Sequence, residues 1–241
     1  KGGSITYNVE DETVKQVVEA SENAIRKLPY RTPEYSVENG ETLLETSEGP
    51  MPIEVFGKHN LSNLAGAKWI CQNMGVDEDD FYEAIATFKG ASKRLEKIAE
   101  GNSSIAYKDF AHSPSKVAAT TKAVKEQYPD RKLIACLELH TYSSFNPEFL
   151  KEYKGALDAA DEAVIFFLPE SVAIKKLDVV TPEQISEAFQ RKDVKIFTDA
   201  KSFHEFLENH QYKNSTLLLM SSGNYGGFDL DKLQGLMAGT T

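Results

Sequence analysis

The chain has little cysteine, and it has no long apolar run. Its two cysteines, Cys71 and Cys136, lie far apart in apolar surroundings, without a Cys-x-x-Cys spacing and without histidines in a metal-binding pattern. We therefore expect two reduced core thiols rather than a disulfide or a zinc site. No stretch approaches the roughly 18 apolar residues that a membrane-spanning helix needs, and the first residues do not resemble a signal peptide. These absences predict a cytoplasmic protein that has no membrane partner.

Basic residues are scarce relative to acidic ones. The 27 lysines and arginines stand against 37 aspartates and glutamates, which gives a formal net charge of -10 at pH 7. A field of this sign repels phosphate backbones, so we expect no nucleic-acid partner. With 41% hydrophobic and 27% charged residues, the composition is that of a globular chain of one or two domains.

The first part of the chain mixes strand and helix patterns. The expected strands cover residues 4–8, 35–37, 42–46 and 51–56. The dipeptide Asn39-Gly40 between two of them predicts a tight hairpin. Helices are expected after Asp11, from about Asn60 to Met74, and after Asp77. A loop with Gly90 and two cations then suggests a domain boundary, with domains at residues 1–87 and 88–241.

The second part alternates regularly between helices and strands after a hairpin at 95–99 and 104–108. The expected helices cover residues 114–127, 147–159, 182–189 and 201–210, with a last one from Asp229. The expected strands cover residues 132–139, 163–168, 194–198 and 216–221. Several of these strands are continuously apolar, which indicates burial on both faces. The pattern predicts an α/β fold with a doubly wound, Rossmann-like parallel sheet between helical layers.

Ligands of such sheets bind outside the carboxyl ends of the strands. The segments that follow the expected strands are unusually polar: Asp109 and His112, then Glu138 and residues 140–144, then 169–170, then 222–227. No Gly-x-Ser-x-Gly elbow, phosphate-binding Gly-x-x-x-x-Gly-Lys-Ser/Thr loop or Gly-x-Gly-x-x-Gly fingerprint occurs in the chain. The polar segments therefore predict a ligand site, while serine-triad hydrolysis and dinucleotide binding are disfavoured.

Two asparagines stand out at the head of a predicted helix. Asn60 and Asn63 are three residues apart, so they share a helix face that continues into an apolar stripe. A buried unpaired amide costs roughly 1–3 kcal/mol, and an adenine edge, which both donates and accepts, would pair with these groups. The alternative is that Asn60 merely caps the helix.

The other candidates also have structural alternatives. Arg94 can bind a phosphate or carboxylate through two hydrogen bonds across a domain cleft, or it can be a solvated cation. Asp109 can take two ribose hydroxyls or be a turn residue, and His112 can be a structural histidine. The hydroxyl-rich segment 140–144 can bind a ligand or cap the next helix. The glycine-rich segment 222–227 can approach a peptide or phosphate closely or be a simple connector.

Three ordered motifs resemble those of the Mur ligase family, the ATP-dependent amide-bond ligases of peptidoglycan metabolism. Residues 57–67 are similar to its Gly-x-His-Asn-x-x-Asn-x-x-Ala-Ala helix, residues 88–96 to its Phe-x-Gly-x-x-Arg-Arg-x-Glu linker, and residues 109–114 to its Asp-Tyr-Ala-His-x-Pro motif. Within the family, residues 138–144 and 221–227 look most similar to the murein peptide ligase branch. That branch joins the recycled tripeptide L-alanyl-γ-D-glutamyl-meso-diaminopimelate to UDP-N-acetylmuramate.

The resemblance also implies a domain assignment. Residues 1–87 would be the C-terminal portion of the central ATP-binding domain, and residues 88–241 the Rossmann-like C-terminal domain. The chain would then begin after the phosphate loop, would hold no catalytic residues, and would be inactive without the N-terminal and phosphate-loop regions of the same protein. The family uses ATP and Mg²⁺, and the metal ligands would lie mostly outside this chain. The alternatives are a UDP-N-acetylmuramate:L-alanine ligase, whose Phe-x-Pro-His-Arg-Tyr loop this chain lacks, and a non-catalytic binding module.

The resemblance assigns roles to individual residues. Asn60 and Asn63 would hold adenine, Asp109 ribose, and Arg94 ribose or phosphate. His59, Lys93 and His112 would support this ATP site, although Lys93 stands where the family often has arginine. The peptide substrate would contact two groups of residues: His140, Thr141, Tyr142, Ser143 and Ser144, and Ser222, Gly223 and Asn224. In the implied reaction ATP activates the sugar carboxylate as an acyl phosphate, which the peptide amine then attacks.

Overall fold

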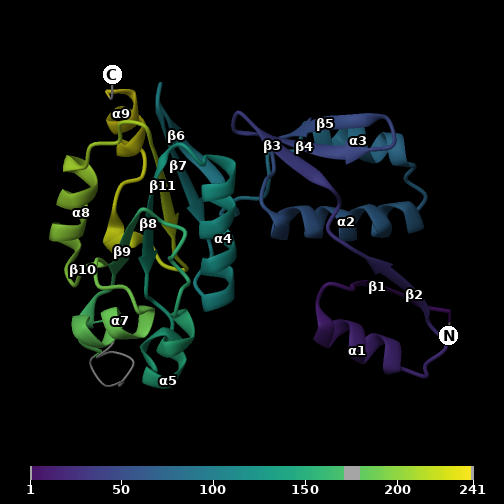
Figure 1. The fold of residues 1–241 in the computed structure, drawn as a ribbon, viewed down its shortest axis with the longest axis horizontal. Coiled ribbons are helices and arrows are strands. Elements are labelled where there is room, and N and C mark those ends of the chain that lie inside the picture. The colour runs from purple at the N-terminus through teal and green to yellow at the C-terminus, as the bar shows by residue number, and fades with distance from the viewer. Residues whose placement is uncertain (1, 171–179, 240–241) are drawn as a thin grey trace. The chain divides into compact units, whose positions relative to one another are not determined.

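The chain consists of two compact units, residues 1–89 and 90–241, in a computed structural model that describes residues 2–170 and 180–239 (Figure 1). The first unit contains two small sheets and three helices among its described residues. The second contains one large sheet with helices on both faces. The expected doubly wound α/β architecture therefore belongs to the second unit.

The first unit opens with a two-stranded parallel sheet. Strand β1 (Ser4–Asn8) leads into helix α1 (Glu12–Ala20) and then into β2 (Arg26–Tyr30), which pairs with β1. Asp11 caps α1 by accepting a hydrogen bond of 3.0 Å from the Val14 amide. Strand β2 is not predicted from the sequence, because Pro29 weakens its strand pattern. Proline is tolerated in a strand that pairs on one side only.

An antiparallel sheet follows, made of β3 (Tyr35–Glu38), β4 (Glu41–Thr46) and β5 (Gly49–Ile53). Asn39 and Gly40 have φ angles of 54° and 82°, as the predicted hairpin turn requires. Strand β5 covers 49–53 rather than the predicted 51–56. Its pairing with β4 ends where Ile53 lies opposite Thr42, because β4 turns into the hairpin just before that point.

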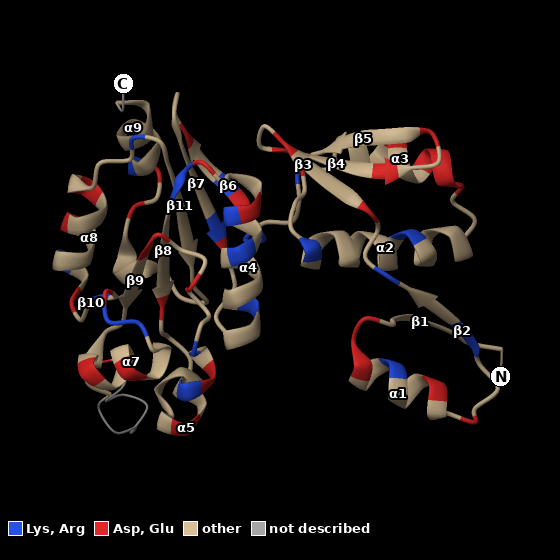
Figure 2. Ribbon diagram, in the orientation of Figure 1, with Lys and Arg blue, Asp and Glu red and all other residues tan. Residues whose placement is uncertain are grey.

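Helices α2 (Lys58–Asn73) and α3 (Glu78–Ala86) complete the first unit. Gly57, with a φ of 87°, is the residue before α2, and the Asp77 carboxylate caps α3. The first turn of α3 carries three acidic residues (Figure 2). Their negative charges interact favourably with the positive end of the helix dipole and so stabilise the helix. The small core of this unit is formed by Leu44, Ile53, Leu61, Leu64 and Phe81.

The second unit is built on a six-stranded sheet in the order β10-β9-β8-β11-β7-β6. The strands are β6 (Glu96–Glu100), β7 (Ser104–Asp109), β8 (Lys132–Glu138), β9 (Glu162–Phe166), β10 (Lys195–Phe197) and β11 (Ser215–Met220). Only β6, at one edge, runs antiparallel to its neighbour. The last long strand of the chain, β11, is thus inserted between β7 and β8.

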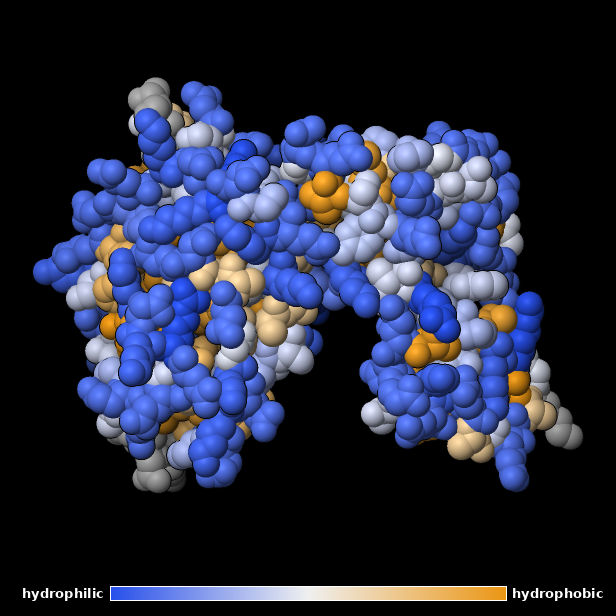
Figure 3. All heavy atoms as spheres, in the orientation of Figure 1, coloured by the Kyte–Doolittle hydropathy of each residue, from blue (hydrophilic) through white to orange (hydrophobic). Residues whose placement is uncertain are grey.

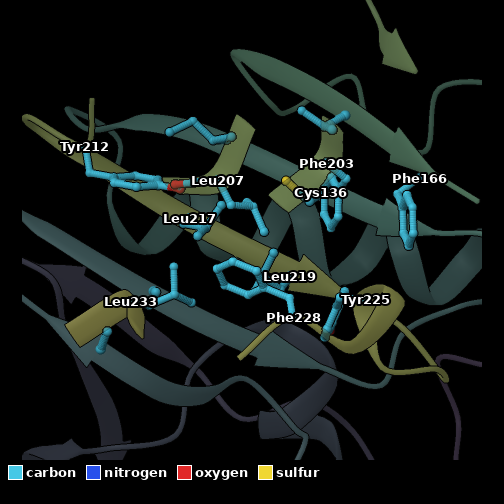
Figure 4. Packing of buried hydrophobic residues seen from close by; sticks show 14 of the residues in the cluster. Cys136, Phe166, Phe203, Leu207, Tyr212, Leu217, Leu219, Tyr225, Phe228 and Leu233 are labelled. Atoms are coloured by element: carbon cyan, nitrogen blue, oxygen red, sulfur yellow. The ribbon is translucent and has the colours of Figure 1, made fainter. Parts of the chain in front are cut away.

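Helices cover both faces of this sheet. They are α4 (Pro114–Gln127), α5 (Pro147–Leu150), α7 (Pro182–Phe189), α8 (Ala200–Asn209) and α9 (Lys232–Ala238). On one face, Leu217 and Leu219 of β11 pack in a buried cluster with Phe203 and Leu207 of α8 and Leu233 of α9 (Figure 4). Helix α4 covers the opposite face, where the Thr121 hydroxyl contacts the Met220 sulfur at 3.8 Å. Alternate residues of one strand are therefore buried against different helices.

The helix expected at residues 147–159 was predicted wrongly. The structure has the four-residue α5, then a 3-10 turn at Lys151–Tyr153, then turns. Gly155 has a φ of 74°, which no α-helix can accommodate. Tyr153 is fully buried and donates a hydrogen bond to the His112 carbonyl, so tertiary packing takes the chain out of the helical path.

Candidate functional site

The carboxyl ends of three neighbouring strands, β7, β11 and β8, lie side by side and form what we call the carboxyl edge of the large sheet. Met220 at the end of β11 pairs with Asp109 of β7 on one side and with Leu137 of β8 on the other. The Ser221 amide then donates a hydrogen bond of 3.0 Å to the Asp109 carbonyl. The polar segments that follow β7, β8 and β11 consequently leave the sheet from adjacent positions.

Asp109 is almost completely buried, with 3% of its surface exposed. One carboxylate oxygen accepts a hydrogen bond of 2.6 Å from the Ala111 amide, and the other accepts one of 2.8 Å from the Leu95 amide. Each oxygen keeps a second lone pair. Asp109 thus fastens the start of the second unit to the end of β7, and its carboxylate retains acceptor capacity.

The residues before β6 have an unusual backbone. Lys93 and Leu95 have φ angles of 58° and 46°, a conformation that costs a non-glycine residue about 1–2 kcal/mol. The Lys93 amide donates to the Glu96 carboxylate at 2.8 Å, and its carbonyl accepts from the Phe110 amide at 2.9 Å. These bonds hold the loop and leave Arg94 on the surface. Within the part of the chain that the structure describes, the Arg94 guanidinium has no hydrogen bond or ion pair.

His112 is half-buried at the start of α4. Its Nδ1 lies 2.8 Å from the Phe110 carbonyl, and its ring packs edge-on against the Phe110 ring at 5.0 Å. Ser113 occupies the predicted cap position of α4, but its side chain makes no capping hydrogen bond. Next to this helix start lies an open cavity of about 500 Å³, which Ser113, Ser115 and Lys154 help to line.

The loop after β8 is stabilised largely by its own hydroxyl groups. The Thr141 and Ser143 hydroxyls lie 3.1 Å apart, and the buried Ser144 hydroxyl donates to the Thr141 carbonyl at 2.8 Å. The cap of α5 is Asn146. His140 and Tyr142 are 45% and 64% exposed. The loop therefore presents His140, Tyr142 and Ser143 at the surface, while Ser144 supports it from inside.

The loop after β11 contains two buried hydroxyls without a hydrogen-bond partner among the described residues, those of Ser222 and Tyr225. Burial raises the pKa of the Tyr225 hydroxyl well above its usual value, and the nearby Glu138 carboxylate adds to this effect. Tyr225 has a φ of 58°, and its carbonyl lies 2.9 Å from Nε2 of His204. Asn224 is exposed.

Both predicted asparagines lie in the first turns of α2. The Asn60 amide nitrogen donates to the Phe56 carbonyl at 3.0 Å, so the capping role belongs to Gly57 and not to Asn60. The Asn63 side chain is exposed and forms no hydrogen bond within the described part of the chain, whereas His59 is half-buried and has a partner. Nearby, Lys58 pairs at 3.2 Å with Glu10, whose pKa is lowered to about 2 chiefly by hydrogen bonds from Thr32.

Part of the stripe that follows the asparagines is exposed. Ile70 and Met74 are 52% and 80% exposed, and Trp69 beside them is 39% exposed. On the face of the molecule in Figure 3, such hydrophobic residues are scattered among predominantly hydrophilic ones. Ile70 and Met74 of the predicted stripe thus meet solvent, whereas Cys71 of the same stripe is half-buried and packs against the core of the first unit.

No group of three His, Cys, Asp or Glu side chains that could hold a metal ion exists among residues 2–170 and 180–239. The Mg²⁺ ligands, which the resemblance places mostly outside this chain, stay a prediction. The two cysteines are free thiols, and within the same residues no helix is long and apolar enough to cross a membrane.

The sequence placed Glu138, Ser221 and Tyr225 in the polar segments but did not predict that they join the loops. Glu138, Ser221 and Tyr225 are buried, and they link the segments after β8 and β11. A signal for this role was present in the sequence, since Glu138 is the one carboxylate within the otherwise apolar run 133–139. A charge at the end of a buried strand needs partners, and this requirement predicts that neighbouring loops supply them.

Residues 93–223, more than half of the chain, match the protein family described as Mur ligase, glutamate ligase domain. The chain belongs to the Mur ligase family. This confirms the resemblance drawn from the three motifs at the level of the family. The second unit, a mixed sheet with helices on both faces, has the fold of the C-terminal domain of this family.

Individual relatives support the same assignment. A UDP-N-acetylmuramate–L-alanine ligase of Sulfurihydrogenibium sp. (strain YO3AOP1) is 26% identical over 231 residues, which cover 92% of this chain and 50% of the relative. The chain thus spans about half the length of this relative.

Two solved structures share the fold. A murein peptide ligase from Psychrobacter arcticus 273-4 has a TM-score of 0.62 at 18% identity, covering 98% of this chain and 52% of the other. A MurF ligase from Thermotoga maritima, solved in complex with ADP, has a TM-score of 0.63 at 15% identity, covering 97% and 52%. At these identities the structures establish the common fold alone.

Proposed function

We propose that this chain supplies ATP-binding and peptide-binding residues to an ATP-dependent ligase that joins UDP-N-acetylmuramate to the recycled tripeptide L-Ala-γ-D-Glu-meso-diaminopimelate. The observation that carries the proposal is the alignment of Asp109, Met220 and Leu137 in one row. It brings one predicted ATP contact and both predicted peptide loops to the same edge of the sheet. The family membership supports ligase chemistry for this edge.

The ATP-binding part of the proposal rests on groups with free hydrogen-bonding capacity. Arg94 offers an exposed guanidinium for phosphate or ribose, Asn63 offers an exposed amide for the base, and Asp109 keeps lone pairs for ribose hydroxyls. Asn60 has committed its amide nitrogen to Phe56, which leaves its oxygen for the adenine amino group. ATP would supply the phosphoryl group that activates the sugar carboxylate.

The peptide-binding part rests on hydrogen-bond donors rather than on charge. Residues 138–144 and 221–227 contain no lysine or arginine, so substrate carboxylates would be received by hydroxyl, imidazole and backbone N–H groups. Donors are spread over two adjacent loops. A tripeptide with several carboxylates can engage both loops, whereas a single alanine is too small to span them. This spread favours the tripeptide.

L-Alanine is the second candidate, because the relative from Sulfurihydrogenibium is named as an L-alanine ligase. The test is ligation of UDP-N-acetylmuramate to each amine by the protein at its full natural length, with the product identified by mass spectrometry. Tripeptide use supports the proposal, and L-alanine use supports the second candidate. If neither is joined, the chain is a binding module of another kind.

Two variants tie the activity to the predicted site. Arg94→Ala and Asp109→Ala should each raise the KM for ATP, while Lys213→Ala should not. Lys213 is an exposed cation just before β11, at the opposite edge of the sheet. We also expect residues 1–241 alone to be inactive, and turnover by this purified chain would refute that part of the proposal.

A further inference from the structure

Glu138 is a carboxylate buried at the point where the two peptide loops begin. It ends β8, is 4% exposed, and follows the buried apolar residues 133–137 of that strand. Burying an ionised carboxylate is costly unless donors surround it. One of its oxygens, Oε2, accepts hydrogen bonds from the Ser221 hydroxyl and, at 2.9 Å, from the Tyr225 amide. Both donors belong to the loop after β11, so the carboxylate of one strand end holds the loop of its neighbour.

The segment 221–225 is wrapped closely around this carboxylate. The Gly223 amide donates a hydrogen bond of 2.6 Å to the Ser221 hydroxyl. That hydroxyl in turn donates a hydrogen bond to the Glu138 carboxylate. A β-carbon on Gly223 would lie 2.7 Å from Oε2 and 2.9 Å from Oε1. Only glycine allows the backbone to approach so closely.

The second oxygen of Glu138 faces the other loop. Its Oε1 lies 3.9 Å from Nδ1 of His140, whose ring is 45% exposed at the surface. This separation is an electrostatic contact that is longer than a hydrogen bond. Glu138 thus bonds one loop through Oε2, and its Oε1 lies beside the exposed imidazole of the other.

We propose that Glu138 is a positioning residue that holds the loops 140–144 and 221–225 as one surface for the amine substrate. The inference rests on the proposed function of these loops. Glu138 is assigned no direct contact with the peptide, because its Oε2 is engaged by Ser221 and Tyr225. It acts through His140, Gly223 and Tyr225, and an apolar side chain in its place would leave the Tyr225 amide without a partner.

The test compares Glu138→Ala and Glu138→Gln in the protein at full natural length. The alanine variant should raise the KM for the amine substrate by roughly tenfold or more, since it removes hydrogen bonds to a charged group, while the KM for ATP stays within about twofold. Glutamine keeps an oxygen acceptor for Ser221 and Tyr225, so its effect should be smaller. Asp161→Asn is the matched control. Asp161 accepts hydrogen bonds from the Leu133 amide and Lys125 at the opposite edge of the sheet.

Hydrogen exchange provides a readout that does not need activity. Amides of residues 221–225 should exchange faster in Glu138→Ala than in the wild type, and they should be unchanged in Asp161→Asn. An amine KM within about twofold of the wild type, or unchanged exchange, would overturn the inference. If Glu138→Ala fails to fold, Ser221→Ala gives the same comparison, because it removes the hydroxyl between Gly223 and Glu138. A wild type that ligates no amine would instead refute the proposed function, and the exchange result would still decide the role of Glu138.

Discussion

At the scale of single residues, carboxylates organise the edge of the large sheet. Asp109 holds the Leu95 and Ala111 amides, Glu96 holds the Lys93 amide, and Glu138 holds the Tyr225 amide. The sequence alone predicted Asp109 as a candidate ligand-binding residue, because it is a carboxylate that follows an expected strand. They did not show that both of its oxygens are already engaged by the backbone. That depends on which amides the fold brings within reach.

Asp109→Ala is expected to destabilise the second unit by about 2 kcal/mol or more, because two backbone amides lose their acceptor in a buried place. Urea unfolding followed by circular dichroism measures this loss. Asp109→Asn, which keeps one acceptor oxygen, should be less destabilised. Equal stability of the alanine variant and the wild type would contradict the proposed anchoring of Leu95.

Arg94→Ala is expected to change the free energy of unfolding by less than about 0.5 kcal/mol, as is usual for an exposed side chain without close contacts. The same variant should weaken ATP binding by the full-length protein, measured by calorimetry. Lys213→Ala should leave both quantities unchanged. A large loss of stability in Arg94→Ala would show that the residue has a structural role instead.

At the scale of elements, capping residues and glycines set the ends of most helices where local sequence predicts them. α4 and α7 cover the predicted residues, and the hairpin at Asn39-Gly40 is confirmed. The exceptions are instructive. Strand β2 was missed because of its proline, and the helix at 147–159 failed because Gly155 and the buried Tyr153 impose another path. In both cases tertiary contacts outweigh local preference.

Thr181→Ala is expected to destabilise the second unit by about 1 kcal/mol. Thr181 forms a capping box with Gln184, in which each side chain accepts a hydrogen bond from the backbone amide of the other. Thermal unfolding measures the loss. Thr181→Ser keeps the hydroxyl and should remain close to the wild type. Equal destabilisation by both substitutions would contradict the capping role.

At the scale of the molecule, a cluster of charged residues lies at the amino-terminal ends of the strands of the large sheet. Glu162 pairs with Lys132 at 2.5 Å and with Lys195 at 2.6 Å, and His210 lies 3.9 Å from it. Burial alone would raise the pKa of Glu162, but hydrogen bonds from the two lysines outweigh it and lower that pKa. Burial lowers the pKa of His210, and the charges of Lys132 and Lys195 add to this, against the opposing pull of Glu162.

These pKa shifts predict that the free energy of unfolding decreases as the pH is lowered, in two separate pH ranges. Since the pKa of His210 is lower in the folded state, the unfolded chain binds the proton first, and stability declines as pH falls below about 6.5. The contribution of Glu162 is present above about 4.5 and declines below it. Urea unfolding from about pH 7.5 down to about pH 3 measures both ranges.

His210→Phe keeps the ring contacts with Phe206 and Tyr212 but removes the titrating group, so it should flatten the upper range alone. Glu162→Gln should reduce the decline in the lower range. A His210→Phe profile identical to that of the wild type would show that this histidine does not contribute.

The sequence by itself determined the family, the α/β class, most element positions and the polar segments after the strands, because caps, glycines and apolar periodicity act over a few neighbouring residues. The three ordered motifs, which lie in residues 57–114, carried the family assignment. Only the tertiary structure decided that β11 lies between β7 and β8, and hence that Ser221 meets both Asp109 and Glu138. Ser221 lies 112 positions after Asp109 and 83 positions after Glu138 along the chain. Which residues become neighbours depends on the spatial order of the strands in the sheet. That order is set by the simultaneous burial of all apolar faces, and no short segment of the sequence contains it.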